Sequence, residues 1–138
     1  MKKLLPFIFL FLISTPVMAE RVASVIGVEG EVTVIREGNG LPVTRGETLH
    51  KSDQITTGQE SAIELKMLDG SFINLGEMAD MFIKELVYDP IKKDGFMDLE
   101  VAVGAFRIVS GSIAKLGPDL MQLKIPVATI GIRGTGLV

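Results

Sequence analysis

The stretch AIELKMLDGSFINL, residues 62–75, decides the fold of this chain. Its first half alternates strictly between apolar and charged side chains, and a second apolar run follows the Asp-Gly pair at positions 69 and 70. Such alternation puts the apolar side chains on one face of an extended strand, and Asp-Gly is typical of a tight turn. The stretch therefore predicts a β-hairpin with one buried face. The expected inward residues are Ile63, Leu65 and Met67, and the outward residues are Glu64 and Lys66.

The length of the turn determines which residues of this hairpin face each other. A two-residue turn would pair Leu65 with Asn74, which would place a polar side chain on the apolar face. A three-residue loop that ends at Gly70, with this glycine in the left-handed conformation, pairs Leu65 with Ile73 instead. We predict the three-residue register because it keeps the apolar side chains together. Its loop is Leu68 to Gly70, and its second apolar pair is Ile63 with Leu75.

The same pattern continues along the chain. Turn signals recur at short intervals from Gly27 to Gly117, and the runs between them are rich in Val, Ile, Phe and Thr. Residues 78–89 also fit helical spacing, but Gly76 and Glu77 make a poor helix start, so we predict a strand there. We expect an all-β fold, either a rolled or solenoid-like domain of short strands or, alternatively, a β-sandwich. A further set is expected to face the core together: Met97, Leu99, Val101 and Val103.

The N-terminal segment has the features of a secretory signal peptide, which we place at residues 1–19. Two lysines precede the apolar segment 4–13, and the small residues near 17–19 suit a signal peptidase. A retained membrane anchor needs about 18–20 uninterrupted apolar residues, and the polar break at 14–16 ends this run early. We therefore expect one domain over residues 20–138, periplasmic or secreted and without stable membrane insertion.

Composition narrows the possible partners and the source of stability. The chain has no cysteine, so burial of apolar side chains rather than disulfides must hold it together. Its formal net charge of −3 argues against nucleic acid as a partner. Residues 29–100 are predominantly acidic and residues 104–138 predominantly basic. We expect these two parts to complement each other within the fold.

The chain shows no set of residues that would support catalysis, and we expect no catalytic residue, no cofactor and no metal ion. The single histidine, His50, is expected at a strand end and facing solvent. Glycines near the C-terminus lack the following helix that a phosphate-binding loop requires. Four aspartates next to turn residues are expected to cap the backbone of the turns. They are Asp53, Asp69, Asp89 and Asp94.

Four segments in this order resemble the FecR domain: IGVEGEVTVIREG (26–38), residues 41–76, AFRIVSGSIAK (105–115) and IPVATIGIRGTG (125–136). The resemblance implies an exported all-β module without catalytic activity. The founding members are iron-uptake regulators, in which such a domain receives a signal from an outer-membrane receptor and a cytoplasmic segment controls a sigma factor. This sequence has a signal peptide at that place and stops at residue 138, so we expect a stand-alone domain rather than sigma-factor control.

The residues that carry the sharpest parts of this resemblance are expected to be structural. Gly131 is expected to permit a close backbone approach, and Arg133 to pair with an Asp or Glu of the acidic part. The expected structural residues are Gly58, Asp69, Gly70, Gly131, Arg133, Gly134 and Thr135.

Two hypotheses for function follow. The first is a protein-binding or signalling module of the cell envelope, which meets its partner through exposed sheet edges or turn faces, with strand addition as a natural mechanism. The second is a glycan-binding or structural envelope module. The chain has no tryptophan and a single tyrosine, Tyr88, which is a poor supply of aromatic rings for stacking on sugars. We therefore prefer the protein partner, and the oligomeric state stays open.

Overall fold

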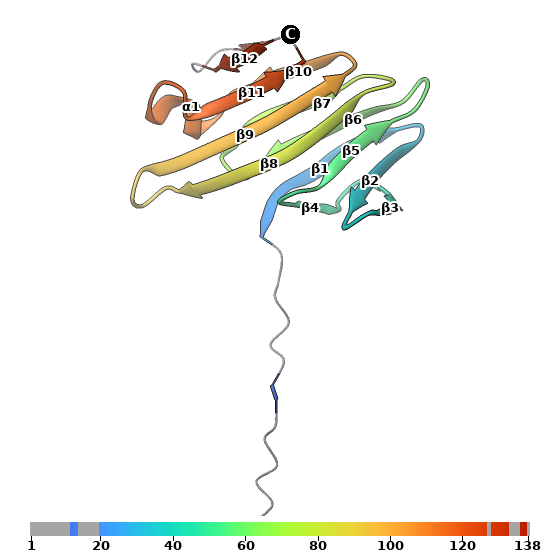
Figure 1. Ribbon diagram of the computed structural model, residues 1–138, viewed down its shortest axis with the longest axis horizontal. Helices are drawn as coiled ribbons and strands as arrows, with labels where there is room; N and C mark the ends of the chain where they lie inside the picture. Colours follow the sequence, from blue (N-terminus) through green and yellow to red (C-terminus); the bar gives the residue numbers. More distant parts are fainter. Residues whose placement is uncertain (1–11, 14–19, 127, 133–135, 138) are drawn as a thin grey trace, which may run out of the picture.

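The structure is a computed structural model, which describes residues 12–13, 20–126, 128–132 and 136–137. Two β-sheets lie one over the other as the layers of a sandwich (Figure 1). In spatial order, sheet A consists of β13 (Gly136–Leu137), β10 (Phe106–Val109), β7 (Phe72–Leu75), β6 (Ala62–Met67), β1 (Arg21–Glu29) and β4 (Thr48–His50). Sheet B consists of β12 (Ala128–Gly131), β11 (Met121–Ile125), β9 (Asp94–Val103), β8 (Asp80–Asp89), β5 (Gln54–Thr57), β2 (Val32–Arg36) and β3 (Asn39–Pro42). The expected all-β class is confirmed, and its layers are those of the sandwich alternative.

The chain passes repeatedly from one sheet to the other. Within each sheet the strands follow one another in chain order from one edge to the other, apart from β3 and β4 at the first edge. Neighbouring strands are antiparallel except for β9 and β11, which are parallel. The first and the last strands of the chain therefore lie toward opposite edges of the sandwich (Figure 1).

The hairpin of β6 and β7 has the predicted register. Leu65 pairs with Ile73 and Ile63 pairs with Leu75. The loop between them is closed by the N–H of Met67, which donates to the carbonyl of Ser71 at 2.7 Å, and Gly70 has a φ of +86°. The predicted three-residue loop is therefore confirmed, and the inward face of the hairpin is buried in the core: Ile63, Leu65, Met67, Ile73 and Leu75.

The segment 80–89 is a strand, as predicted, and it forms the longest hairpin of the domain with β9. Met97, Leu99 and Val101 of β9 are buried, but Val103 is 58% exposed, so its prediction as a core residue is wrong. The reason is a register shift beside Asp80 of β8, with which Val103 pairs. A bulge of this kind reverses the direction of the following side chains.

The core lies between the sheets and is almost entirely aliphatic. Leu65 and Ile73 of sheet A and Met81 and Leu99 of sheet B have no exposed surface and belong to one buried cluster. Removal of this apolar surface from water is the main source of stability in a domain without disulfides. The inward faces of both sheets are thus used for folding, and only the outward faces, the edges and the turns are available for binding.

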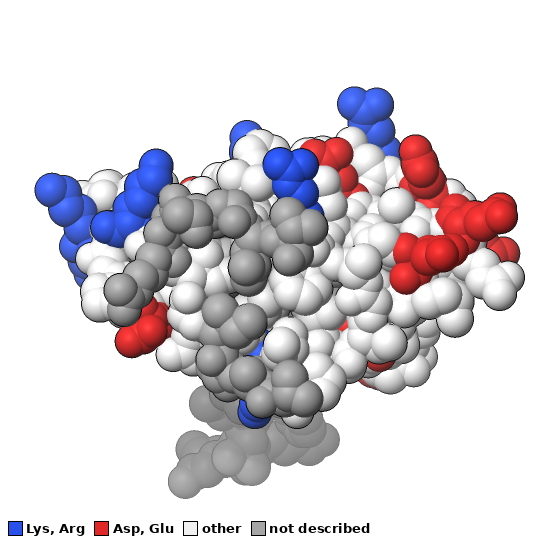
Figure 2. Space-filling view, turned by 90° about the horizontal axis from the view of Figure 1, so that it is seen from above, with Lys and Arg blue, Asp and Glu red and all other residues white. Residues whose placement is uncertain are grey.

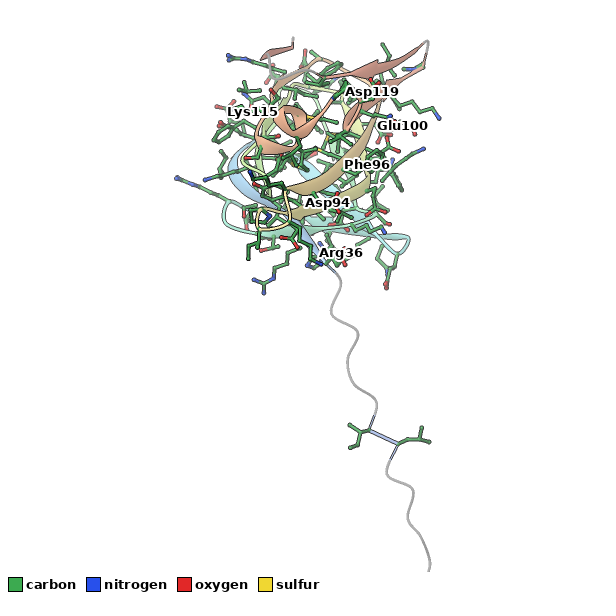
Figure 3. The ribbon with its side chains drawn as sticks, turned by 90° about the vertical axis from the view of Figure 1, so that its left-hand side faces the viewer. Arg36, Asp94, Phe96, Glu100, Lys115 and Asp119 are labelled. Atoms are coloured by element: carbon green, nitrogen blue, oxygen red, sulfur yellow. The ribbon has the colours of Figure 1, made fainter. Side chains whose placement is uncertain are left out.

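A short helix, α1 (Ser112–Leu116), was not expected from the sequence. It lies at one end of the sandwich, where Figure 3 labels Lys115 on it. Ile113 is fully buried, and a Cβ placed on Gly95 of β9 would lie 2.8 Å from its Cγ1. The helix therefore closes this end of the core.

Within the described part of the chain, no helix combines the length and the apolar character needed to cross a bilayer. The predicted signal peptide and its cleavage position lie outside the described residues except for positions 12 and 13.

Candidate functional site

Asp69 and Gly70, two of the residues marked by the sequence, serve the architecture of the β6–β7 loop. The Asp69 carboxylate is 4% exposed and accepts hydrogen bonds from the backbone N–H of Ser71 at 3.0 Å and from its hydroxyl at 3.0 Å. It also accepts from the N–H of Ile113 at 3.1 Å, which attaches α1 to this loop. Both oxygens of this buried carboxylate already accept hydrogen bonds from within the protein, so its role is structural.

Among the remaining motif residues, the structure describes Gly58 and Gly131. Gly58 follows β5 and donates its N–H to the carbonyl of Glu31 at 3.0 Å. A Cβ at Gly131 would lie 2.5 Å from Oδ1 of Asp119, so the close approach at Gly131 is made by a side chain and not, as predicted, by the backbone. The predicted ion pair of Arg133, and the positions of Gly134 and Thr135, lie outside the described residues.

Asp53 does more than cap a turn. Its carboxylate is buried and forms a two-point ion pair with Arg36, at 2.9 Å from Nε and 2.7 Å from Nη2. The same carboxylate accepts the backbone N–H of His50 at 2.8 Å. The hydrogen bond with Asp53 raises the pKa of Arg36. His50 ends β4 but is half-buried, with Nδ1 buried and unpaired, so its prediction as a solvent-facing residue is wrong.

Among the described residues the ion pairs are Arg36–Asp53, Lys51–Glu85 and Lys84–Glu100, and none of them reaches residues 104–138. The pKa of Glu100 is lowered chiefly by Lys84 and also by the charge of Lys124, which belongs to the basic part. The predicted charge complementarity between the two parts stays a prediction. Acidic side chains gather at one end of the face seen in Figure 2. The turns at the far ends of β1, β5 and β7 supply Glu29, Glu31, Glu60 and Glu77.

The outer face of sheet A carries the most distinctive group of side chains. Three strands, β6, β7 and β10, lie side by side there, and their outward residues form two rows across the strands. The first row contains an acid, an amide and a guanidinium: Glu64, Asn74 and Arg107. The second row contains a cation and two apolar side chains: Lys66, Phe72 and Val109.

The polar groups of the first row have unused bonding capacity. Within the described part of the chain, no ion pair joins Glu64 or Arg107 to another residue. Asn74 stands between them, and its Oδ1 is buried and accepts no hydrogen bond. An unpaired buried acceptor costs about 1–3 kcal/mol, so this arrangement carries a stability cost that the fold does not require.

These residues surround two hollows that share Glu64 and Asn74. The first, of about 240 Å³, is completed by Phe72, Arg107 and Val109. The second, of about 310 Å³, continues over Gly27, Val28 and Glu29 of β1, toward the acidic end. We call the two together the sheet A groove. Phe72 is 37% exposed and Val109 is 39% exposed beside it, so the groove offers both apolar surface and charge.

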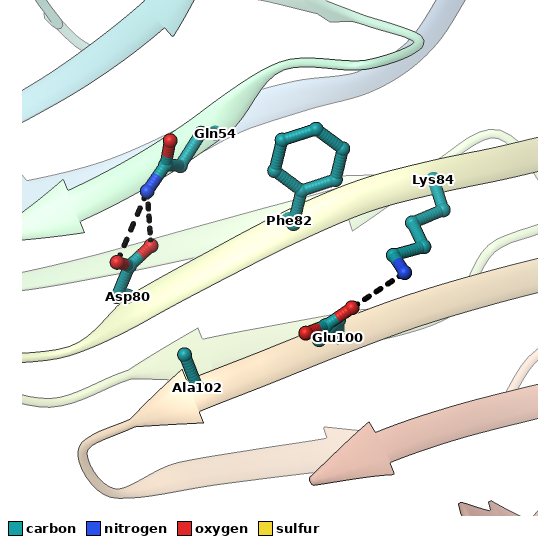
Figure 4. Close-up of a pocket in the computed structure, with 6 residues that line it drawn as sticks. All are labelled: Gln54, Asp80, Phe82, Lys84, Glu100 and Ala102. Carbon is teal, nitrogen blue, oxygen red and sulfur yellow. Dashed lines mark hydrogen bonds and ion pairs between the residues drawn. The ribbon is translucent and has the colours of Figure 1, made fainter. Parts of the chain in front are cut away.

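A comparable hollow on the outer face of sheet B differs from the sheet A groove in that its polar groups are bonded to one another. It has about 270 Å³ and lies around Phe82 (Figure 4). Its polar groups bond to one another: Gln54 Nε2 donates to Asp80 at 2.8 and 3.0 Å, and Lys84 Nζ lies 2.6 Å from Glu100. The hydrogen bond between Lys84 and Glu100 raises the pKa of the lysine and lowers that of the glutamate.

The residues of the sheet A groove were not singled out from the sequence, although part of the signal was present. The hairpin register already places Glu64, Phe72 and Asn74 on the outer face. The alternation in FRIV at 106–109 predicts that Arg107 and Val109 share a face. What the sequence does not contain is the pairing of β7 with β10, which brings the two sets together.

Among the described residues, no group of three or more Asp, Glu or His side chains could hold a metal ion. The class that the fold defines is an all-β sandwich domain. Comparison with protein-family models, with curated proteins and with solved structures finds no match to this chain.

Proposed function

We propose that this chain is a non-catalytic, exported binding module of the bacterial cell envelope that holds a protein partner on the outer face of sheet A. The observation that carries the proposal is the sheet A groove, where Glu64, Asn74 and Arg107 have free bonding capacity beside the exposed Phe72 and Val109. Aromatic side chains and arginine are enriched among the residues that dominate protein–protein binding.

The contrast between the two outer faces supports the choice of surface. On sheet B the charged groups around Phe82 are satisfied within the chain, so a partner would have to break those bonds before making its own. On sheet A, Glu64 and Arg107 are exposed and have no ion pair with another described residue, so a partner replaces their contacts with water and need not break such a pair first.

The resemblance to the FecR domain and the signal-like N-terminus support the cellular setting of the proposal. Both features come from the sequence: the four ordered segments, and the lysines and apolar run at residues 1–19. They favour an exported signalling or interaction module whose partner belongs to the envelope, with no catalytic role.

A glycan-binding module is the second candidate, and one observation favours it. Phe82 lies in the sheet B hollow among amide, carboxylate and ammonium groups, a combination that can stack on a sugar ring and bond to its hydroxyls. Under this candidate the outer face of sheet B, rather than sheet A, is the binding surface.

Site-directed photo-crosslinking in intact cells distinguishes the two. A photoreactive phenylalanine analogue replaces Phe72 in one variant and Phe82 in a matched variant, each in the full chain with its N-terminal segment. We expect one discrete protein adduct from position 72 and none from position 82. Absence of a protein adduct at position 72, together with retention on an envelope polysaccharide that is lost in Phe82→Ala, would favour the glycan instead.

A further inference from the structure

We propose that the sheet A groove binds an extended peptide segment with a basic side chain at one end, an acidic side chain at the other and apolar side chains between them. This inference rests on the proposed function, because it specifies the segment of the partner that enters the groove. It follows from the order of charges across three neighbouring strands.

The spacing of the charged residues determines the length of the segment. Glu64 on β6 and Arg107 on β10 both pair with Asn74 on β7, so they are two strand spacings apart. Neighbouring strands are about 4.8 Å apart, which gives about 10 Å between the two Cα atoms. An extended polyproline-II-like segment rises about 3.1 Å per residue and returns to the same side every third residue. Side chains at positions i and i+3 of such a segment therefore match Glu64 and Arg107.

The signs of the charges determine its composition. The Arg107 guanidinium is suited to a carboxylate, which it can bind through two parallel hydrogen bonds. Glu64 at the other end of the row favours a lysine or arginine, and Glu29 in the adjoining hollow adds to the negative potential there. A segment with the same charge at both ends would meet a like charge at one of them.

The apolar part of the segment has its own contacts. Phe72 and Val109 are direct cross-strand neighbours, and each keeps more than a third of its surface exposed at the wall of the groove. The segment itself passes over Asn74, and one of its two middle side chains points toward this pair in the neighbouring row. Burial of an exposed aromatic side chain supplies the affinity, and the two charges at the ends supply the selection.

The test uses three blocked peptides of equal length: Lys-Leu-Leu-Asp, Lys-Leu-Leu-Lys and Asp-Leu-Leu-Asp. Binding to the purified full chain is followed by two-dimensional amide NMR, which detects weak association and locates it. We expect the mixed-charge peptide to bind about two- to fivefold more tightly than either of the others. The amide shifts should lie on β6, β7 and β10.

Charge-reversal variants then distinguish charge-dependent selection among the peptides from non-specific binding. Arg107→Glu should make Lys-Leu-Leu-Lys the preferred peptide, and Glu64→Lys should make Asp-Leu-Leu-Asp the preferred one. Lys124→Glu, an exposed cation of sheet B, is the matched control and should leave the order unchanged. Phe72→Ala should weaken all three by a similar factor, about fivefold.

Equal binding of the three peptides, shifts confined to sheet B, or an order that charge reversal does not change would each overturn this inference. The proposed function has its own readout, the protein adduct at position 72. If an adduct forms there but the peptides bind equally, the proposed peptide segment is wrong and the proposal of a protein partner stands. If the peptides bind selectively but no adduct forms in cells, the groove binds such a segment and the proposed function is wrong.

Discussion

Asp69 and Ile113 are joined by a hydrogen bond from the backbone N–H of Ile113 to Oδ2 of Asp69, at 3.1 Å and across 44 residues of chain. Asp69 belongs to a loop of sheet A, whereas the side chain of Ile113 packs against β9 of sheet B. One buried carboxylate thus connects a tight turn of one sheet to the helix that packs against the other. We expect the stability of this end of the domain to depend on both residues.

Asp69→Ala should lower the free energy of unfolding by about 3 kcal/mol, because two backbone N–H groups and a hydroxyl lose their buried acceptor. Urea unfolding followed by circular dichroism measures this change. The matched control is Asp89→Ala, which removes an exposed carboxylate that accepts from two turn N–H groups and should cost about 1 kcal/mol or less. Equal losses in the two variants would show that the burial of Asp69 has no special importance.

Ile113→Ala should cost about 3 kcal/mol, since it leaves a cavity between α1 and β9. Ile91→Ala makes the same chemical change at a residue that is 92% exposed and should alter stability by less than about 0.5 kcal/mol. Thermal unfolding of the two variants is the measurement. A small effect at Ile113 would mean that the helix is not part of the cooperative core.

The hairpin at 62–75 could be predicted down to its register because period-two alternation and turn chemistry are local properties. Val103 could not, because the bulge beside Asp80 depends on how β8 pairs with β9. Helix α1 is too short for a periodic signal, and its first turn is held by contacts of Ile113 with Asp69 and Gly95, which lie far away in sequence.

In the candidate site, too, the local features could be predicted from the sequence and the long-range pairings could not. The outward direction of Glu64 follows from the alternation around it, but its position in one row with Arg107 requires the pairing of β7 with both β6 and β10. The two-point contact of Arg36 with Asp53 likewise joins segments that no local pattern links. Long-range strand order, which the sequence does not display, is what assembles both groups.

Arg36→Ala should destabilise the domain by about 2 kcal/mol, because it leaves the Asp53 carboxylate, 1% exposed, without its guanidinium. A double-mutant cycle with Asp53→Asn measures the coupling, which should be favourable by more than 1 kcal/mol, roughly twice the value of a typical surface pair. The exposed pair Lys51–Glu85 is the control and should show no measurable coupling. Additive effects at Arg36 and Asp53 would contradict the expected interaction.

Glu100 should titrate below its ordinary pKa of 4.5, chiefly because the Lys84 ammonium donates a hydrogen bond to its carboxylate. A lowered pKa means that the folded state binds the proton less readily than the unfolded state. The resulting stabilisation is present above pH 4.5 and is lost as the pH falls through the lowered pKa. Carboxyl-carbon NMR should show the pKa of Glu100 rising toward 4.5 in Lys84→Met, and an unchanged pKa in that variant would exclude the lysine as the cause.

Asn74→Val should separate stability from binding. The substitution removes a buried oxygen that accepts no hydrogen bond and introduces a β-branched residue into a strand, so the free energy of unfolding should rise by about 1 kcal/mol. The same change removes the amide between Glu64 and Arg107, so the adduct formed at position 72 should weaken. Thr33→Val, on the outer face of sheet B, is the control and should leave the adduct unchanged. A residue that served only the fold would lower stability when replaced, whereas a gain in stability with a loss of binding is the expected signature of a residue kept for its ligand.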